Sequence, residues 1–243
     1  MKIIFCCLFV WGIWPVCQAQ ELRIVADNWA PMTGKNLQSG GFSIDLTRQL
    51  LTELGYTVTL TFMDWDQIVG TMGTDNYDVI PAVWYTAKRG KRMHFSQAYD
   101  HNKLVFISRQ ADAFQYSGPT SLANKTLGLV KSYAYPESVL QAKGVNIIFA
   151  TDAKQNLQKL AGGALHLTLG AYLVMKFEAT RHVHPAHKLF YDTDHPLKDI
   201  PLHIAVSRKF KGYKKLITDI NNGLTTFKQD GRYRQLQNQH GLD

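Results

Sequence analysis

The chain has 243 residues, of which 45% are hydrophobic, 12% aromatic and 19% charged, and its formal net charge is +8 at pH 7. This composition excludes a disordered or fibrous chain, and the length suits one large domain or two modest ones. The basic residues are spread along the whole chain, with one short cluster at 88–92. We therefore expect no nucleic-acid partner.

Residues 1–19 have the pattern of a secretory signal peptide. Lys2 precedes an apolar run, and the small residues Cys17 and Ala19 stand at positions −3 and −1 of a cleavage site. We predict export to the periplasm, with cleavage after Ala19. A lipoprotein processed at Cys17 is the alternative, but the residues before that cysteine fit such a site poorly.

All three cysteines, Cys6, Cys7 and Cys17, lie within this predicted signal peptide. The exported product would hold none, which excludes disulfides, thiolate catalysis and cysteine-ligated metal. We expect no membrane span after residue 20.

The remaining chain alternates between predicted strands and helices. Hydrophobic periodicity and helix caps at Ser43, Asp64 and Asp152 define these elements. We predict strands at 22–26, 56–62, 78–83, 126–130, 145–149, 165–169 and 202–206, and helices at 43–55, 64–72, 136–142, 152–160, 171–180 and 216–227, with a final turn after Gly231.

Repeated strand–helix–strand units predict mainly parallel sheets covered by helices. Two runs of such units fit two α/β lobes better than one sheet. Ligands bind sheets of this kind beyond the carboxyl ends of the strands, so the residues that follow strands are the candidates for a site.

Trp29, Trp65 and Trp84 each follow a predicted strand. Indoles in that position can form the wall of a small-molecule cleft. Packing within a core or interface is the alternative. The equivalent position of all three favours the cleft.

Thr86 and Arg89 come shortly after the third tryptophan. A guanidinium matches the geometry of a carboxylate and stays charged at physiological pH. Arg89 beside Thr86 in a cleft would therefore anchor an acidic ligand group. A solvated basic helix end, together with Lys88, Lys91 and Arg92, is the alternative.

Five segments carry a family pattern. Residues 41–46 read GFSIDL, 77–80 read YDVI and 86–89 read TAKR, while 95–99 read FSQAY and 222–233 run from NGL to DGRY. In this order they resemble the G-x-x-x-D-L, D-V-I, T-x-x-R, F-S-x-P-Y and N-x-G-L…D-G-x-Y motifs of the bacterial extracellular solute-binding proteins of the polar amino-acid type, family 3. Ala98 stands where proline is usual. The resemblance spans essentially the whole chain after the signal peptide.

The resemblance implies a type II periplasmic-binding-protein fold, an α/β architecture in which each of two lobes is a mixed, mainly parallel sheet flanked by helices. Lobe one would comprise 20–105 and 206–243, and lobe two 106–205. Two hinge strands would fall near 104–108 and 202–207. The implied function is capture of a small carboxylate-bearing solute, amino-acid-like or an organic acid, for an ABC-type importer. We expect a monomer whose partner is a membrane permease or receptor.

The resemblance also implies site residues. In relatives the arginine of T-x-x-R grips the ligand α-carboxylate, which points to Arg89 with Thr86 beside it. Trp29 would cover the ligand, Trp65 would line the other wall, and backbone groups from Ala82 to Trp84 would complete the first half. A helix start after Gly128 would add amides from the second lobe, at Ser132, Tyr133 and Tyr135.

One departure from the family pattern bears on the ligand. Relatives that bind amino acids carry an aspartate for the ligand ammonium where this chain has Ala171. A buried ammonium without a charged partner is costly. The sequence therefore predicts a carboxylated, partly aromatic or apolar ligand, unless another carboxylate such as Asp192 or Asp194 substitutes.

Other functions are weighed against this one. The spacing of His182, His184 and His187 could suit a zinc site, but no ligand set completes it. We therefore expect no metal and no cofactor.

A cyclohexadienyl-type dehydratase on the same fold would need a cleft acid, for which Asp152, His166 and Glu178 are candidates. No catalytic motif is present, so we expect a binding protein; a ligand sensor that docks onto a receptor has the same cleft.

Overall fold

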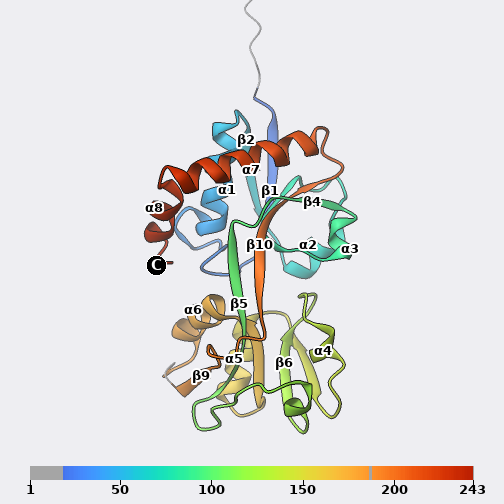
Figure 1. Ribbon diagram of the computed structural model, residues 1–243, viewed down its shortest axis with the longest axis vertical. Helices are drawn as coiled ribbons and strands as arrows, with labels where there is room; N and C mark the ends of the chain where they lie inside the picture. Colours follow the sequence, from blue (N-terminus) through green and yellow to red (C-terminus); the bar gives the residue numbers. More distant parts are fainter. Residues whose placement is uncertain (1–18, 186–187, 243) are drawn as a thin grey trace, which may run out of the picture.

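The computed structural model describes residues 19–185 and 188–242. Figure 1 shows two lobes that are joined by two long neighbouring strands, β5 (Asp100–Arg109) and β10 (Lys198–Ser207). The predicted two-lobed α/β fold is confirmed. The predicted signal peptide lies outside the described residues, except for Ala19.

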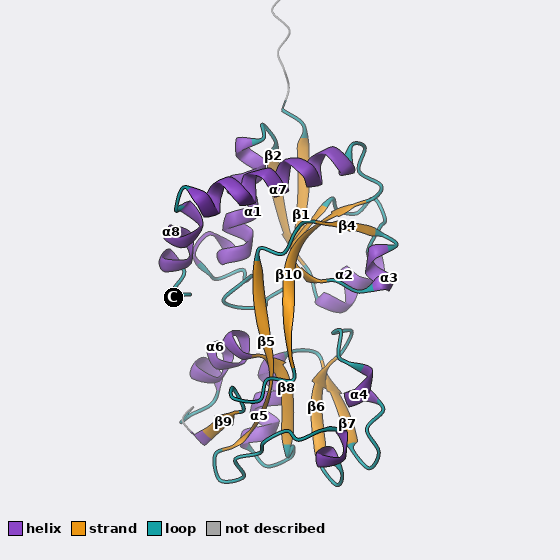
Figure 2. Cartoon of the chain, viewed as in Figure 1, coloured by secondary structure: helices purple, strands orange, loops and turns teal. Residues whose placement is uncertain are grey.

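The sheet of the first lobe is built around β1 (Glu21–Ala26), which lies between β2 (Thr57–Phe62) and β3 (Val79–Trp84). All three strands are parallel. Their carboxyl ends therefore share one edge of the sheet, and in Figure 2 this edge faces the second lobe. The fold thus directs the residues after β1, β2 and β3 toward the space between the lobes.

The sheet of the second lobe is built around β6 (Thr126–Val130). It lies between β7 (Asn146–Ala150) and β8 (Leu167–Ala171), and all three are parallel. A short strand, β9 (Leu189–Tyr191), pairs with β5. Each lobe thus contains the predicted parallel core.

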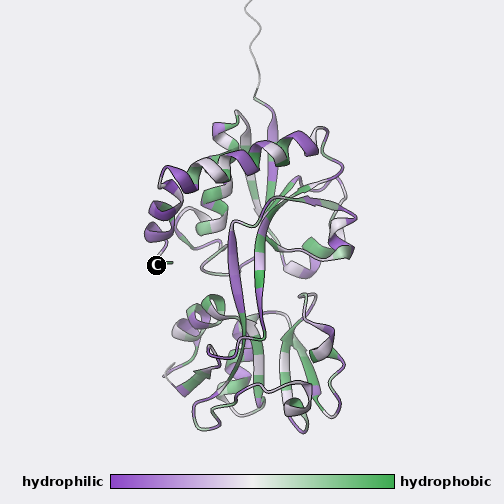
Figure 3. Cartoon of the chain, in the orientation of Figure 1, coloured by the Kyte–Doolittle hydropathy of each residue, from purple (hydrophilic) through white to green (hydrophobic). Residues whose placement is uncertain are grey.

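The two linking strands make the sheets continuous. In the first lobe β10 runs antiparallel to β3 and to the short β4 (Met93–Phe95), and in the second lobe β5 runs antiparallel to β8. The main path of the sheet is β2-β1-β3-β10-β5-β8-β6-β7. Figure 3 shows that the first half of β5, where it passes between the lobes, is hydrophilic. The exact lobe boundaries given above stay a prediction.

Helices cover both sheets. In the first lobe α7 crosses in front of β1 and β2 in Figure 1 and packs on α1 and β10. The helices of this lobe are α1 (Phe42–Glu53), α2 (Trp65–Thr71), α3 (Ala87–Gly90), α7 (Tyr213–Gln229) and α8 (Arg232–Gln239), with the 3-10 turn η1 (Gln38–Gly40). Those of the second lobe are α4 (Glu137–Leu140), α5 (Ala153–Ala161) and α6 (Tyr172–His182), with η2 (Pro119–Leu122).

Two local expectations are wrong. Helix α1 is preceded by Gly41, not capped by Ser43, and Gly41 has a φ of 97°. A Cβ at Gly41 would lie 2.7 Å from the Met32 carbonyl oxygen, so the residue there is glycine for steric reasons. The chain after Gly231 forms helix α8 where a turn is predicted.

Candidate ligand-binding site between the lobes

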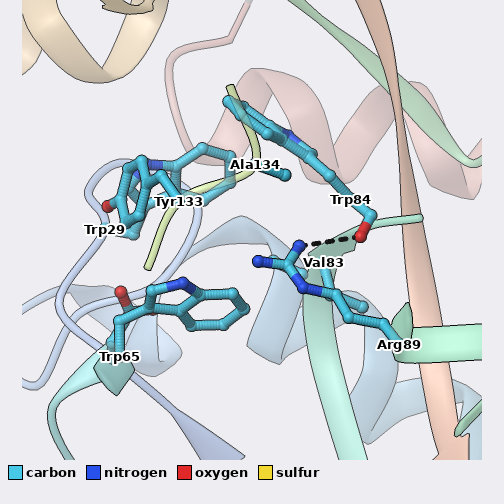
Figure 4. Close-up of a pocket in the computed structure, with 9 residues that line it drawn as sticks. Trp29, Trp65, Val83, Trp84, Arg89, Tyr133 and Ala134 are labelled. Atoms are coloured by element: carbon cyan, nitrogen blue, oxygen red, sulfur yellow. Dashed lines mark hydrogen bonds between the residues drawn. The ribbon is translucent and has the colours of Figure 1, made fainter. Parts of the chain in front are cut away.

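A pocket with an empty volume of about 310 Å³ lies between the lobes (Figure 4). Its walls come from the carboxyl ends of β1 and β3, the start of α2, helix α3, and the loop that follows β6. The residues that line it are Asp27, Trp29, Trp65, Ala82, Val83, Trp84, Arg89, Tyr133 and Ala134.

Arg89 is the cation of this pocket. Thr86 caps α3 by accepting a hydrogen bond from the Arg89 backbone N–H at 3.2 Å, which fixes the start of the side chain. Arg89 as a whole residue is 7% exposed, and its guanidinium donates to the carbonyl oxygens of Trp84, at 2.9 Å, and Ser132, at 3.2 Å. It lies 5.0 Å from the centroid of the Trp65 ring.

Within residues 19–185 and 188–242, no carboxylate forms an ion pair with Arg89. Burial lowers the pKa of Arg89 to about 10, so the side chain still carries its charge at neutral pH. A buried cation whose partners are neutral carbonyls favours an incoming anion. Its planar donors suit a carboxylate in particular.

Aromatic rings form the pocket walls. Trp29 packs edge-on against Trp84, with ring centroids 5.9 Å apart. Tyr133 of the second lobe lies 6.2 Å from both Trp65 and Trp84. Trp29 and Trp84 are also part of the buried core. These two indoles therefore line the pocket and pack in the core, which are the two alternatives that the sequence leaves open.

The second lobe contributes a loop in place of a helix start. Residues 131–136 are not helical, and α4 begins only at Glu137, so the predicted helix start after Gly128 is wrong. Ser132 has a φ of 61°, a left-handed conformation that interrupts a helix. Its carbonyl oxygen accepts hydrogen bonds from Arg89 and from Trp65 Nε1, the latter at 3.1 Å.

A second contact between the lobes lies beside this loop. Lys131 Nζ forms an ion pair with Asp66 at 2.7 Å, and the Ser132 hydroxyl donates to the same carboxylate. These hydrogen bonds lower the pKa of Asp66. Residues at the start of α2 thus contact the loop after β6 through backbone and side chains.

The nine predicted site residues are brought together to different degrees. Trp29, Trp65, Ala82, Trp84, Arg89 and Tyr133 line the pocket described above. Thr86 and Ser132 line a neighbouring hollow instead. Tyr135 lies behind Tyr133, with ring centroids 6.1 Å apart, and its hydroxyl accepts from the Val130 N–H at 3.0 Å. Tyr135 therefore supports Tyr133 and lines neither hollow.

Asp27 lines the pocket and is missing from the sequence prediction. Asp27 directly follows β1. The position after a strand identifies Trp29 as a candidate, and the same signal applies to Asp27. Burial, followed by the charge of Asp64, raises the pKa of Asp27 from 3.8 to about 7. The pocket thus holds a carboxyl that can ionise in response to a cationic group. Val83 and Ala134 are further lining residues.

The residues considered as substitutes for an aspartate at Ala171 lie elsewhere. Ala171 ends β8 and is buried. The Asp192 carboxylate is 1% exposed, accepts from the Tyr116 N–H at 2.8 Å, and contacts His195 at 3.0 Å. It therefore holds neighbouring loops, and neither Asp192 nor Asp194 lines the pocket.

For the described part of the chain, no group of three or more histidine, cysteine, aspartate or glutamate side chains is placed to hold a metal ion. His182 instead contacts Glu178 at 3.3 Å. His187, part of the histidine pattern discussed above, lies outside the described residues.

A sequence model of the bacterial extracellular solute-binding proteins, family 3, matches residues 22–243. The chain belongs to this family. The family resemblance is confirmed, and this family-3 protein is accordingly a solute-binding protein.

Two relatives have names that describe transport proteins. The chain is 23% identical over 211 residues to a "Probable amino-acid ABC transporter-binding protein" of Haemophilus influenzae, covering 86% of this chain and 79% of that one. It is 24% identical over 208 residues to "ABC transporter arginine-binding protein 1" of Escherichia coli, covering 85% and 83%. Both names describe binding proteins.

A solved structure shares the fold of this family-3 protein. An ancestral arginine-binding protein bound to glutamine superimposes with a TM-score of 0.76 at 21% identity, over 92% of this chain and 98% of that one. In addition, no helix within residues 19–185 and 188–242 is both long and apolar enough to span a membrane.

Proposed function

We propose that this protein binds a free amino acid between its lobes and presents it to the permease of an ABC-type importer. The observation that carries the proposal is the buried Arg89 guanidinium, which lines the interlobe pocket and has no carboxylate partner among the described residues. A ligand carboxylate held by two parallel N–H donors would offset the cost of burying this cation.

Asp27 would recognise the ammonium group of the ligand. Its carboxyl lines the same pocket as Arg89, and a ligand ammonium would pair with it and favour its ionised form. In this proposal Asp27 takes the role for which Ala171 is unsuited, so an ordinary α-amino acid becomes a suitable ligand. The names of the relatives, which refer to amino-acid transport and to arginine, support the same ligand class.

The aromatic walls exclude water from the bound carboxylate. Trp65, Trp84 and Tyr133 surround the guanidinium with rings from both lobes. Charge-assisted hydrogen bonds are stronger where water is excluded, so closure of the lobes would tighten the grip on the ligand. Rotation of the lobes would take place at β5 and β10.

The proposal also covers the location, the oligomeric state and the lobe boundaries of the protein. It is exported to the periplasm with cleavage after Ala19, works as a monomer, and releases its ligand unchanged. Lobe one comprises residues 20–105 and 206–243, and lobe two comprises 106–205.

Calorimetric titration with the standard L-amino acids tests the proposal. We expect saturable one-to-one binding of at least one amino acid, and a loss of about 2–4 kcal/mol of its binding free energy in Arg89→Gln. Lys91→Gln is the matched control, because Lys91 is an exposed cation two residues away that does not line the pocket. The absence of binding by every amino acid, or equal binding by Arg89→Gln, would refute the proposal.

A further inference from the structure

A second hollow, of about 640 Å³, opens beside the first. It shares Arg89, Tyr133 and Ala134 with the first pocket, so the two spaces meet at the guanidinium. The other residues that line it are Val69, Met72, Thr86, Lys88, Arg92 and Ser132. A ligand bound at Arg89 therefore has room to extend in this direction.

Among the described residues, those that line the second hollow include three cations and no acidic side chain. Lys88, Arg89 and Arg92 contribute the charges. Among the ion pairs of the described residues, none joins any of these three side chains to a carboxylate. Arg92 is 3.5 Å from the Met72 carbonyl oxygen, and the Thr86 hydroxyl accepts from Arg89. The polar partners present are therefore neutral.

Asp66 contacts Ser132, which lines this hollow, and its carboxylate forms an ion pair with Lys131. Its carboxylate accepts hydrogen bonds from Lys131 and from the Ser132 hydroxyl. The electrostatic field of the second hollow is therefore positive. Such a field favours an anionic group and disfavours an ammonium or guanidinium group.

We propose that the second hollow receives an anionic side-chain group, a carboxylate or a phosphate, of the amino acid whose α-carboxylate binds Arg89. This inference rests on the proposed function and narrows the ligand to acidic amino acids. Arg89 lies at the junction of the two spaces, Lys88 and Arg92 bind the side-chain anion, and Asp27 faces the ligand in the first pocket.

Pairs of ligands that differ in one charge test this inference. We would titrate glutamate against glutamine, aspartate against asparagine, and phosphoserine against serine. At low salt we expect the anionic member of at least one pair to bind tenfold or more tightly, and this preference to shrink as salt is added, because Lys88 and Arg92 are solvent-exposed. The carboxylate pairs and the phosphate pair show which anion the hollow takes.

Variants assign the preference to these side chains. Lys88→Gln/Arg92→Gln should abolish the preference for the anion, so that the two members of each ligand pair bind with equal affinity. Lys91→Gln, which removes an exposed cation outside the hollow, should retain the preference. Melting temperatures of both variants establish that they fold.

The inference and the proposed function fail in different ways. Equal affinity within every pair, tighter binding of arginine or lysine, or a preference that survives Lys88→Gln/Arg92→Gln overturns the inference, while binding of a neutral or basic amino acid leaves the proposed function standing. If no amino acid of any charge binds, both are overturned.

Discussion

The buried guanidinium of Arg89, in the first lobe, donates a hydrogen bond of 3.2 Å to the backbone carbonyl of Ser132 in the second lobe. Trp65 Nε1 donates to the same carbonyl at 3.1 Å. The group proposed to hold the ligand is therefore also a contact between the lobes. A ligand that orders Arg89 and contacts both lobes would shift the protein toward its closed form.

Trp65 gives a prediction that separates ligand binding from core packing. Trp65→Ala removes the ring beside Arg89 and the hydrogen bond to Ser132, so we expect a loss of about 1–3 kcal/mol of amino-acid binding free energy. Trp65→Phe keeps a ring and loses only the N–H donor, so its loss should be smaller. Because Trp65 is only partly buried, the melting temperature should change little. A large drop in melting temperature with unchanged affinity would show that the ring serves the core.

Asp27 makes the stability of the ligand-free protein depend on pH. Between its ordinary pKa of 3.8 and the folded value of about 7, the folded protein holds a proton that the unfolded chain has lost. The contribution of Asp27 to the free energy of unfolding is therefore present below pH 3.8, and it falls as the pH rises toward 7. Asp27→Asn removes this dependence, so its melting temperature should exceed that of the wild type at pH 8 and approach it at pH 4. Parallel curves across this range would contradict the assignment.

The same carboxyl gives a prediction for ligand binding. A ligand ammonium beside Asp27 lowers the pKa of its carboxyl, so binding near pH 6 should release a proton. Calorimetry of the same amino acid in two buffers with different ionisation enthalpies measures this release. We expect it to vanish above pH 8 and in Asp27→Asn, and proton uptake at pH 6 would exclude an ammonium at this carboxyl.

Gly128 has a structural role in the second lobe. A Cβ at this position would overlap the Leu165 side chain and lie 2.6 Å from Asn156 Oδ1, and both neighbours are buried. Gly128→Ala should therefore lower the free energy of unfolding by about 1–3 kcal/mol. Gly70→Ala in α2 is the control, because a Cβ there meets nothing within 4 Å, and it should stabilise or leave stability unchanged. Urea denaturation of both variants measures the difference, and equal effects would contradict the packing argument.

The parallel cores of both lobes can be predicted from sequence because their periodicity is strong. Strand β6 is predicted residue for residue, and β2 shows the expected alternation of burial. For β5, only a hinge strand near 104–108 is expected, from the family resemblance, whereas the strand begins at Asp100 with the polar residues DHNK. Asn102 in that segment is nevertheless buried, and it accepts a hydrogen bond of 2.9 Å from Trp84 Nε1. Tertiary contact, which the local sequence does not encode, makes this segment a strand.

The part of the candidate site that lies just after the ends of strands can be predicted from the sequence. Trp29 and Trp65 are identified because parallel strands bring their carboxyl ends to one edge, and Arg89 is identified from its T-x-x-R motif. Asp27 occupies the same kind of position, but its raised pKa arises from burial in the assembled pocket, which the local sequence does not encode. Ser132 has a left-handed conformation and accepts hydrogen bonds from Trp65 and Arg89 of the other lobe, and the local sequence predicts neither.

Calorimetric titration of the standard L-amino acids, together with the α-carboxamide of each one that binds, tests the central claim most directly. If Arg89 holds the α-carboxylate, the free acid binds one-to-one, and its carboxamide binds at least about thirtyfold more weakly, since it lacks the negative charge. A carboxamide that binds as tightly as the acid would contradict the account.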